Sequence, residues 1–464
     1  MLSLTVSACK AKGVDNVIQA PEFENVTVHD PSVIYTEDEY YVFGSHLQAA
    51  KSENLTQWQQ ISKSVPLNTL FEDVYKEFAE EFEYAKTDTF WAPDVIQLKD
   101  GRYYLYYCLC KGDQPLSVLG VAVADNIEGP YEKIESFLYS GTSPQFGETY
   151  DATKDPNAVD PNVFFDKEGK LWMVYGSYSG GIFILEMDEN TGLPKDRNTY
   201  GKKLTGGNHS RIEAPYILYN EETDYYYLFT SFGGLDSFGG YNMRVARSKS
   251  PDGPYLDILN QSMEEAKGKE KSFFDDLSIE GFGNKLMGNF TYVEDDGLTN
   301  DGYVSAGHNS VLFDEKTKDY YVFFHTRFPN GGENHELRVH KLYFTTDGWP
   351  IMSPLRYSGE EITKLNKNQI AGNYKWISTT KEIIDWIEEP IMVSLEKKGS
   401  ITGVDKGNWH LAESPEEDST VEIDGEQYHG QFLYTWDQTQ ETAVISFTGV
   451  SQKGIPLFLI EDKK

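Results

Sequence analysis

The 464-residue chain is poor in positive charge and in long apolar runs. Its 41 Lys and Arg face 74 Asp and Glu, which gives a net charge of −33. Such a field argues against nucleic acid and anionic membrane surfaces as partners, because both bind basic surfaces. No apolar run approaches the roughly 18 residues of a membrane-spanning helix. The acids are spread along the chain, so we expect a solvated surface, and a neutral substrate fits it better than a polyanion.

Cysteine is also scarce, with three in the chain. Cys108 and Cys110 lie two apart on one expected strand, too close to bridge each other comfortably, and are expected as small core residues. Cys9 follows "LTVSA", which resembles a bacterial lipoprotein cleavage box but has only eight residues before it. Either the start is trimmed or the match is chance. We interpret residues 1–20 as an export or lipoprotein remnant and linker, in a protein exported from a bacterial cell. It is then anchored at Cys9, or else periplasmic or extracellular.

Several chemistries lack their motifs. The chain has no G-x-S-x-G, no Walker-type loop and no C-x-x-C, which argues against a serine nucleophile, a phosphate cradle and a paired-cysteine metal site. Helical periodicity is weak, and residues 70–86 are the clearest candidate. Aromatic residues are abundant at 14%, with 31 Tyr. Tyr and Trp serve β-sheet cores and also make the flat, part-polar surfaces on which sugar rings stack.

One short unit recurs five times. It has a polar or proline-bearing start, three or four apolar residues, a charged turn and an aromatic-rich strand, which predicts a β-hairpin. The five copies are "VHDPSVIYTEDEYYVFGS" from 28, "WAPDVIQLKDGRYYLYYC" from 91, "VDPNVFFDKEGKLWMVYGS" from 159, "IEAPYILYNEETDYYYLFTS" from 212 and "GHNSVLFDEKTKDYYVFFHT" from 307.

Further strands lie between the copies, for example at 117–125, 180–188 and 241–250. Four strands per unit, repeated five times, predict an all-β chain with a five-bladed β-propeller at residues 21–355. A β-sandwich is the alternative, but it does not demand five matched strand starts. Residues 356–464 carry "NYKWISTTKEI" and "FLYTWDQTQETAVISFTG", which predict a small C-terminal β-barrel or β-sandwich domain without a catalytic constellation. This domain binds glycan or simply buttresses the propeller.

The residues immediately before the five apolar runs form a set. They are Asp30, Ala92, Asp160, Glu213 and His308. The innermost strands of a propeller converge on its axis, so we expect these residues to be neighbours. Three carboxylates and a histidine at one level are costly in a merely structural core, which indicates a functional site. Either acid–base cleavage of a glycosidic bond or binding of a hard metal fits three acids. The aromatic surroundings, with Trp91 beside Ala92, favour a sugar.

"HDPS", "DPNVFFD", "IEAPY" and "GHNSV", in this order, resemble glycoside hydrolase family 43, within its arabinan endo-1,5-α-L-arabinanases. "FWAPDV" and "HELRVHKLYFTTDGWP" extend the resemblance over roughly residues 21–355, and the tail resembles the small barrel of the two-domain members. The resemblance implies inverting endo-hydrolysis of α-1,5-L-arabinofuranosidic linkages in arabinan. We expect the protein to be a monomer. It makes Asp30 the general base and Glu213 the general acid. Asp160 is then the third acid, which raises the pKa of Glu213 and orients it.

The resemblance also implies ligands. His308 matches a histidine that holds one calcium ion largely through waters; the alternative is a hydrogen-bonded axial histidine. Trp91 is expected to stack on a furanose. The other residues expected to line the substrate cleft are Gly120, Asn157 to Asp160, Ser177, Tyr178 and Ser179. The stretch Ser177 to Ser179 fits ordinary strand-end polar residues as well.

Other functions stay open at this point. An exo-acting α-L-arabinofuranosidase or β-xylosidase fits the same three acids, and a non-catalytic glycan-binding propeller is a further class. The glycine-rich stretch 230–242 is expected to form a rim of the cleft rather than a phosphate cradle, because it lacks a Lys and a following helix pattern. Residues 328–340, with two histidines and Arg338, support the rim or the axial site, or are simply surface residues.

Overall fold

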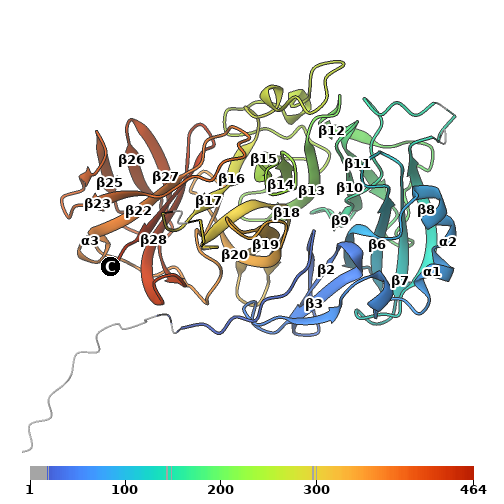
Figure 1. The fold of residues 1–464 in the computed structure, drawn as a ribbon, viewed down its shortest axis with the longest axis horizontal. Coiled ribbons are helices and arrows are strands. Elements are labelled where there is room, and N and C mark those ends of the chain that lie inside the picture. The colour runs from blue at the N-terminus through green and yellow to red at the C-terminus, as the bar shows by residue number, and fades with distance from the viewer. Residues whose placement is uncertain are drawn as a thin grey trace, which may run out of the picture.

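The computed structural model describes residues 18, 20–142, 145–147, 149–294, 297–298 and 300–463, so Cys9 lies outside the described residues. Five antiparallel sheets, each built from consecutive strands, form the five blades of a β-propeller, as predicted (Figure 1). Blade 1 consists of β1 (Ser32–Thr36), β2 (Glu39–Gly44), β3 (Gln48–Ser52) and β4 (Gln59–Ser62), and blade 2 of β5 (Trp91–Gln97), β6 (Tyr103–Cys110), β7 (Ser117–Ala124) and β8 (Glu132–Ser140). Blade 3 consists of β9 (Asn162–Phe165), β10 (Leu171–Ser177), β11 (Gly181–Met187) and β12 (Lys202–Thr205), and blade 4 of β13 (Ile212–Asn220), β14 (Tyr225–Phe232), β15 (Asn242–Ser248) and β16 (Asn284–Met287). Blade 5 consists of β17 (Phe290–Thr291), β18 (Gly302–Asp314), β19 (Asp319–Arg327), β20 (Glu336–Phe344) and β21 (Pro350–Met352).

Helix is confined to short segments between strands. These are α1 (Val74–Glu77), α2 (Ala79–Ala85) and α3 (Lys367–Ile370), with the 3₁₀ turns η1 (Ser45–Leu47), η2 (Val65–Leu67), η3 (Met263–Glu265) and η4 (Asp276–Ser278). The helix predicted over 70–86 is present but is broken into two at Phe78. The Phe78 side chain is fully buried against Phe71, Phe90 and Tyr107, so packing into blade 2 decides where the helix breaks. Within the described residues no helix is both long and apolar enough to cross a membrane.

The first and last blades meet through an apolar cluster rather than through a shared sheet. Val28 and Tyr40 from the first part of the chain pack in one cluster with Phe323 and Val339 of blade 5. The backbone N–H of Leu337 donates to Val26 O over 3.1 Å, so the segment before β1 runs along β20. This closure brings Asp30, at the start of blade 1, beside blade 5.

The C-terminal residues form one eight-stranded sheet in the order β24-β23-β22-β29-β28-β27-β26-β25. Its strands are β22 (Gly372–Ser378), β23 (Ile391–Leu395), β24 (Ile401–Thr402), β25 (Gly407–His410), β26 (Ser419–Ile423), β27 (Glu426–Asp437), β28 (Thr442–Ser451) and β29 (Pro456–Glu461). A bridge between Ser400 and Asn408 brings the two edges together, so the sheet nearly closes into a barrel. The predicted all-β fold, a propeller followed by a small barrel, is confirmed.

The barrel packs directly on the propeller (Figure 1). Phe458 and Val444 of the barrel lie in one buried cluster with Met287 and Phe290 of the propeller. Polar contacts flank this cluster, because the Thr448 hydroxyl donates to Met352 O over 2.6 Å. The barrel therefore buttresses blades 4 and 5.

A ring of polar residues lies on the inner strands, two positions after the expected site residues. Asp94 of blade 2 accepts hydrogen bonds from the Ser32 hydroxyl of blade 1 and, over 2.6 Å, from the Val163 N–H of blade 3. Asn162 Nδ2 donates to the same carboxyl over 3.3 Å, and its own Oδ1 accepts from the Ile217 N–H of blade 4 over 2.9 Å. Burial raises the pKa of Asp94 to about 7, despite these donors. Asp94 thus ties three blades together beneath the site.

Replacing Asp94 by alanine is expected to lower the melting temperature by roughly 5–10 °C. The buried donors of Ser32, Asn162 and Val163 would lose their acceptor, and leaving buried polar groups unsatisfied costs about 1–3 kcal/mol of stability. A loss of about 1 kcal/mol lowers the melting temperature of a large domain by roughly 2–4 °C. Thermal unfolding followed by circular dichroism measures the change. Asp100→Ala is the matched control, because it removes an exposed carboxyl of the same blade that pairs with Arg102. Equal melting temperatures for the two variants would contradict this role of Asp94.

Candidate active site

In four blades a residue on the inner strand, or shortly before it, has left-handed backbone. The φ angle is 56° at Asp30, 54° at Asp160, 55° at Ala214 and 47° at His308. Outside glycine such conformations cost on the order of 1–3 kcal/mol and collect at functional sites, where the surrounding structure holds them. Asp30 and Asp160 are nearly fully buried, at 6% and 8% exposed.

Glu213 is predicted to be the structural equivalent of Asp30 and Asp160 in its blade, and this prediction is wrong by one residue. Ala214 has the left-handed backbone and precedes a proline, so Ala214 is the counterpart of Asp30 and Asp160. Glu213 lies one residue earlier, opposite Ser231, and a register shift follows it. Trp91 has the same place in blade 2, opposite Cys108 and before a register shift. The bulge lets the side chain of Glu213, rather than that of Ala214, join the site.

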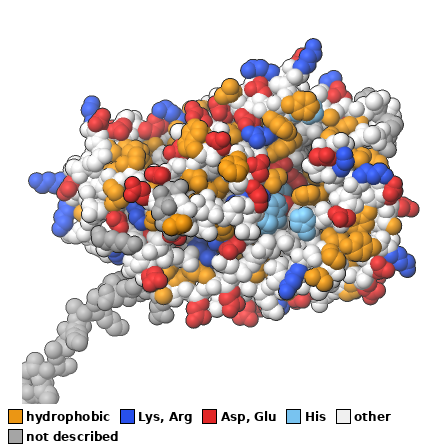
Figure 2. Space-filling view, in the orientation of Figure 1, with side chains coloured by type: hydrophobic (Ala, Val, Ile, Leu, Met, Phe, Trp, Pro, Cys, Tyr) orange, Lys and Arg blue, Asp and Glu red, His pale blue; other side chains and the backbone are white. Residues whose placement is uncertain are grey.

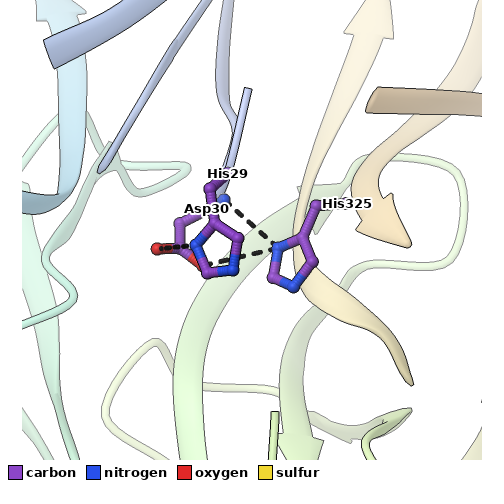
Figure 3. Close-up of side chains that lie close together, drawn as sticks. All are labelled: His29, Asp30 and His325. Atoms are coloured by element: carbon purple, nitrogen blue, oxygen red, sulfur yellow. Dashed lines mark hydrogen bonds and ion pairs between the residues drawn. The ribbon is translucent and has the colours of Figure 1, made fainter. Parts of the chain in front are cut away.

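Asp30 is surrounded by nitrogen atoms and a hydroxyl, and Figure 3 shows two of the neighbouring imidazoles, those of His29 and His325. Its Oδ2 lies 2.7 Å from His29 Nδ1 and accepts from the Ser45 hydroxyl, and its Oδ1 lies 2.9 Å from His308 Nδ1. Burial alone would raise the pKa of Asp30, but the charges and hydrogen bonds of His29 and His308 hold it well below the usual range. Asp30 is therefore an anion at neutral pH, as a general base must be.

His325 supports Asp30 from the end of β19. The Asp30 backbone N–H donates to His325 Nδ1 over 3.2 Å, and the ring stacks on His29 with 3.9 Å between centroids. Burial lowers the pKa of His325 well below its usual value, so this imidazole is neutral. It orients the backbone of Asp30 and adds no charge.

Glu213 has different neighbours. The Ser177 hydroxyl donates to Oε2 and the Tyr241 hydroxyl to Oε1, each over 2.8 Å. Burial raises the pKa of Glu213, and the nearby Asp30 carboxylate adds to this, although His308, Ser177 and Tyr241 oppose it. A carboxyl with a raised pKa keeps its proton at higher pH, which suits a general acid.

Asp160 lies beside Glu213. Its Oδ2 accepts from the N–H of Ala214, the residue after Glu213, over 3.3 Å. Burial raises the pKa of Asp160 to about 8; His308 lowers it, and the carboxylates of Glu213 and Asp30 raise it. Two interacting carboxyl groups titrate as a pair, and this pair retains a proton near neutral pH.

His308 joins the two halves of the site. Burial lowers its pKa, but the charges of Asp30, Asp160 and Glu213 and the bond to Asp30 raise it to about 9 overall. Its backbone N–H donates to the Ser231 hydroxyl over 2.8 Å. His308 is therefore a cation at neutral pH in this arrangement, and it is shared by all three acids.

Two groups of ligand atoms bear on metal binding. In the described part of the chain, one ligand atom each of His29, Asp30 and His325 lie within 4.8 Å of one another. Two imidazoles and one carboxylate suit transition metals better than calcium, which prefers oxygen. At His308 the Nδ1 atom is taken by Asp30, which leaves Nε2 as its available ligand atom. The side chains thus fit calcium as one protein ligand in a shell completed by water, and they form no oxygen cage.

Most of the expected substrate residues surround this centre. The Trp91 ring is half-buried, 5.4 Å from that of His46, and its indole N–H donates to Cys110 O over 2.9 Å. Ser177 bonds Glu213 and is followed by the half-buried Tyr178 and the buried Ser179, which has left-handed backbone.

Two expected substrate contacts look different in the structure. Asn157 Oδ1 accepts from the Ser117 hydroxyl over 2.6 Å, so this oxygen is held within blade 2. Gly120 is buried. It lies in the middle of β7, paired with Tyr107, and a Cβ there would lie 2.4 Å from Glu135 O. Close packing between β6 and β8 explains this glycine.

Sequence reasoning missed several residues that hold the three acids in place. Ser177 was expected in the substrate cleft, and Ser45 and Ser231 carry the same signal, because all three stand at the end of the second strand of a repeat, in "YGS", "FGS" and "FTS". His29 and His325 also lie inside the quoted repeats. Tyr241 lies on the stretch interpreted as a rim and carried no signal of its own.

Five blades around a buried acid–base constellation define a glycoside hydrolase, and the comparisons agree. The family described as glycosyl hydrolases family 43 matches residues 23–276, and a C-terminal lipocalin-like domain matches residues 354–459. The chain belongs to glycosyl hydrolases family 43.

Two curated relatives are similar over nearly the whole chain. The extracellular endo-alpha-(1->5)-L-arabinanase 2 of Bacillus subtilis (strain 168) is 53% identical over 439 residues, which is 94% of this chain and 93% of the relative. The extracellular endo-alpha-(1->5)-L-arabinanase of Thermotoga petrophila is 47% identical over 95% of this chain and 94% of its own. A crystal structure of a family 43 glycoside hydrolase from Bacillus licheniformis is 52% identical, with a TM-score of 0.91 over 96% of this chain and 100% of that one.

Ser177→Ala should move the alkaline limb of the pH–rate profile upward. The Ser177 hydroxyl lowers the pKa of Glu213, so its loss raises that pKa, and the acid stays protonated to higher pH. One hydrogen bond of about 1 kcal/mol corresponds to roughly half a pH unit or slightly more. The measurement is kcat/KM for glycoside hydrolysis from pH 5 to 10. Ser179→Ala is the matched control, on the same turn. A downward shift, or the same shift in both variants, would refute the contact's role.

Proposed function

We propose that the protein is an inverting endo-hydrolase of α-1,5-linked L-arabinan, with Asp30 as general base and Glu213 as general acid. The observation that carries this proposal is the difference between two buried carboxyl environments. Histidines keep Asp30 ionised, while burial and mutual repulsion keep a proton on the Glu213–Asp160 pair. Glycoside hydrolysis with inversion needs one carboxyl group in each state at the same pH.

The reaction then proceeds in one displacement. Asp30 accepts a proton from a water molecule, whose oxygen forms a bond to the anomeric carbon. On the other side the bond from that carbon to the glycosidic oxygen breaks, and Glu213 gives its proton to this oxygen. The Ser177 and Tyr241 hydroxyls hold both oxygens of Glu213 and thereby fix the direction in which it presents the proton. The acid–base pair contributes typically about 10²–10⁴-fold per group to such rates.

The endo assignment rests on similarity. Both relatives that are about half identical over nearly their full lengths carry endo-arabinanase names. An exo-acting α-L-arabinofuranosidase or β-xylosidase would use the same three acids and differ in the loops that border the cleft. A non-catalytic glycan-binding propeller would not need a proton-retaining carboxyl pair beside an ionised one.

We propose that the protein acts outside the cytoplasm, because both of those relatives are named extracellular. Lipid attachment at Cys9 is a separate part of this proposal and rests on the "LTVSA" pattern before it. Labelling with radioactive palmitate in a bacterial host tests the attachment. A Cys9→Ser variant that keeps its label would refute it.

Digestion of linear α-1,5-arabinan, followed at once by proton NMR, tests the proposed reaction. We expect the β-anomer first, because a single displacement inverts the α-linkage, and we expect oligosaccharides rather than free arabinose. Asp30→Asn and Glu213→Gln are the inactive references, and Asp113→Asn is the control for an exposed acid. An initial α-anomer would overturn Asp30 as base, and arabinose as the sole first product would make the enzyme exo-acting.

We also propose that one calcium ion replaces the Nε2 proton of His308 and is held there by the neutral imidazole and by waters. A calcium ion bound there would supply positive charge close to Asp30. Elemental analysis should find about one calcium per chain, and chelation should lower the melting temperature, because a ligand bound only by the folded state stabilises it. His308→Gln should lose this response, whereas His410→Gln, which changes an exposed histidine on β25, should keep it. A metal-free protein that is unaffected by chelator would leave His308 as an axial histidine that serves Asp30 alone.

A further inference from the structure

The loop between η3 and β16 exposes large apolar side chains. Phe273 is 72% exposed, Phe274 is 52% exposed and Leu277 is 80% exposed. Single exposed apolar residues are ordinary, but neighbouring aromatic rings on one loop make a patch, and such patches mark binding surfaces. Figure 2 shows hydrophobic side chains (orange) in several groups on one face of the molecule, with histidines (pale blue) at the surface near its middle.

The rings of this loop form a built surface. The Phe273 ring lies parallel to the His209 ring, with 4.2 Å between centroids and 8° between planes. Phe274 stands edge-on to Phe273, with centroids 6.2 Å apart. Burial lowers the pKa of His209, so its imidazole is a neutral flat ring at neutral pH. We call Phe273, Phe274 and His209 the aromatic platform.

Polar contacts fix the aromatic platform in place. The Phe274 backbone N–H donates to His209 O over 3.2 Å. Arg211 pairs through Nε and Nη2 with the two carboxylate oxygens of Asp276, and its guanidinium lies 5.8 Å from the centre of the Phe274 ring. Rings that are held before binding lose little conformational entropy when a ligand arrives. This rigidity distinguishes the platform from an accidental apolar loop.

The aromatic platform is continuous with the catalytic centre. The Tyr178 ring lies 5.7 Å from that of Phe274, and its hydroxyl donates to Gly233 O. Tyr178 directly follows Ser177, which donates to the general acid Glu213. A row of side chains therefore leads from Glu213 over Tyr178 to Phe274 and Phe273. A polymer bound at the catalytic centre can follow this row outward.

We propose that the aromatic platform is an outer sugar-binding site that stacks an arabinofuranosyl unit of the polymer several units away from the cleaved bond. This inference rests on the proposed function. The C–H face of a neutral sugar packs on aromatic rings while its hydroxyl groups remain in water. A neutral ligand also agrees with the strongly acidic chain. The platform makes affinity depend on chain length, because only longer oligosaccharides reach it.

The test compares short and long substrates. For the Phe273→Ala/Phe274→Ala double variant we expect kcat/KM on linear α-1,5-arabino-octaose to fall about tenfold, through KM, which corresponds to about 1.4 kcal/mol. On the shortest oligosaccharide that the wild type cleaves, the two proteins should be equal. Phe273→Tyr/Phe274→Tyr keeps the rings and should restore the octaose rate. Leu277→Ala removes an exposed apolar side chain of the same loop without a ring and should change neither substrate.

Three results would overturn the inference. The first is an equal loss of kcat/KM on short and long substrates in the double variant, which would make the loop a support of the catalytic centre. The second is no loss of kcat/KM on either substrate. The third is the same loss on octaose in Leu277→Ala. Melting temperatures show whether each variant is folded, and binding of octaose to an inactive Glu213→Gln background, with and without the double substitution, gives the same answer without turnover. A wild type that cleaves no arabinan oligosaccharide would instead refute the proposed function, and the inference with it.

Discussion

The site depends on burying three carboxylates and a histidine within reach of one another's charge. At an effective dielectric constant of about 20, two unit charges 4 Å apart interact by about 4 kcal/mol, so the three acids cannot all ionise cheaply. His29 and His308 both contact Asp30 directly, and Asp30 is the carboxyl that stays ionised. Glu213 and Asp160 receive hydroxyl and backbone donors instead and share the remaining proton. Because the hydrogen-bond partners of the three carboxyl groups differ, the site holds a protonated acid and an ionised base at the same pH.

The propeller gives each of the three carboxyl groups a different set of hydrogen-bond partners. Each acid sits on a different blade, so each has its own second strand and its own neighbour from the next blade. In blade 1, Ser45 at the end of the second strand donates to Asp30 of the same blade. In blade 3, the equivalent Ser177 donates to Glu213 of the following blade. Asp94 holds blades 1 to 3 together just beneath, and the barrel packs on blades 4 and 5. The catalytic geometry is therefore fixed by contacts between blades.

The repeat was readable in the sequence because strand periodicity and turn residues recur in each blade, which is why the architecture and the three acids could be predicted. The one-residue error at Glu213 has a physical cause, since a bulge shifts the register and periodicity alone does not reveal a bulge. Close packing between β6 and β8 already requires a glycine at Gly120, and a single sequence does not distinguish such a glycine from one beside a ligand. His325 comes from blade 5, and only the closed ring brings it to Asp30. Tyr241 directly precedes β15 in the same blade as Glu213, and periodicity does not show that its hydroxyl reaches that carboxyl.

The central claim is that Asp30 is ionised near neutral pH while the Glu213–Asp160 pair keeps a proton. Carbon-13 NMR of protein labelled at the aspartate carboxyl groups measures this directly, with Asp30→Asn and Asp160→Asn variants to assign the two resonances. The resonance lost in Asp160→Asn should titrate near pH 8, and the one lost in Asp30→Asn should remain that of an ionised carboxylate down to about pH 4. An Asp30 resonance that titrates near neutral pH, with Asp160 ionised throughout, would contradict the account.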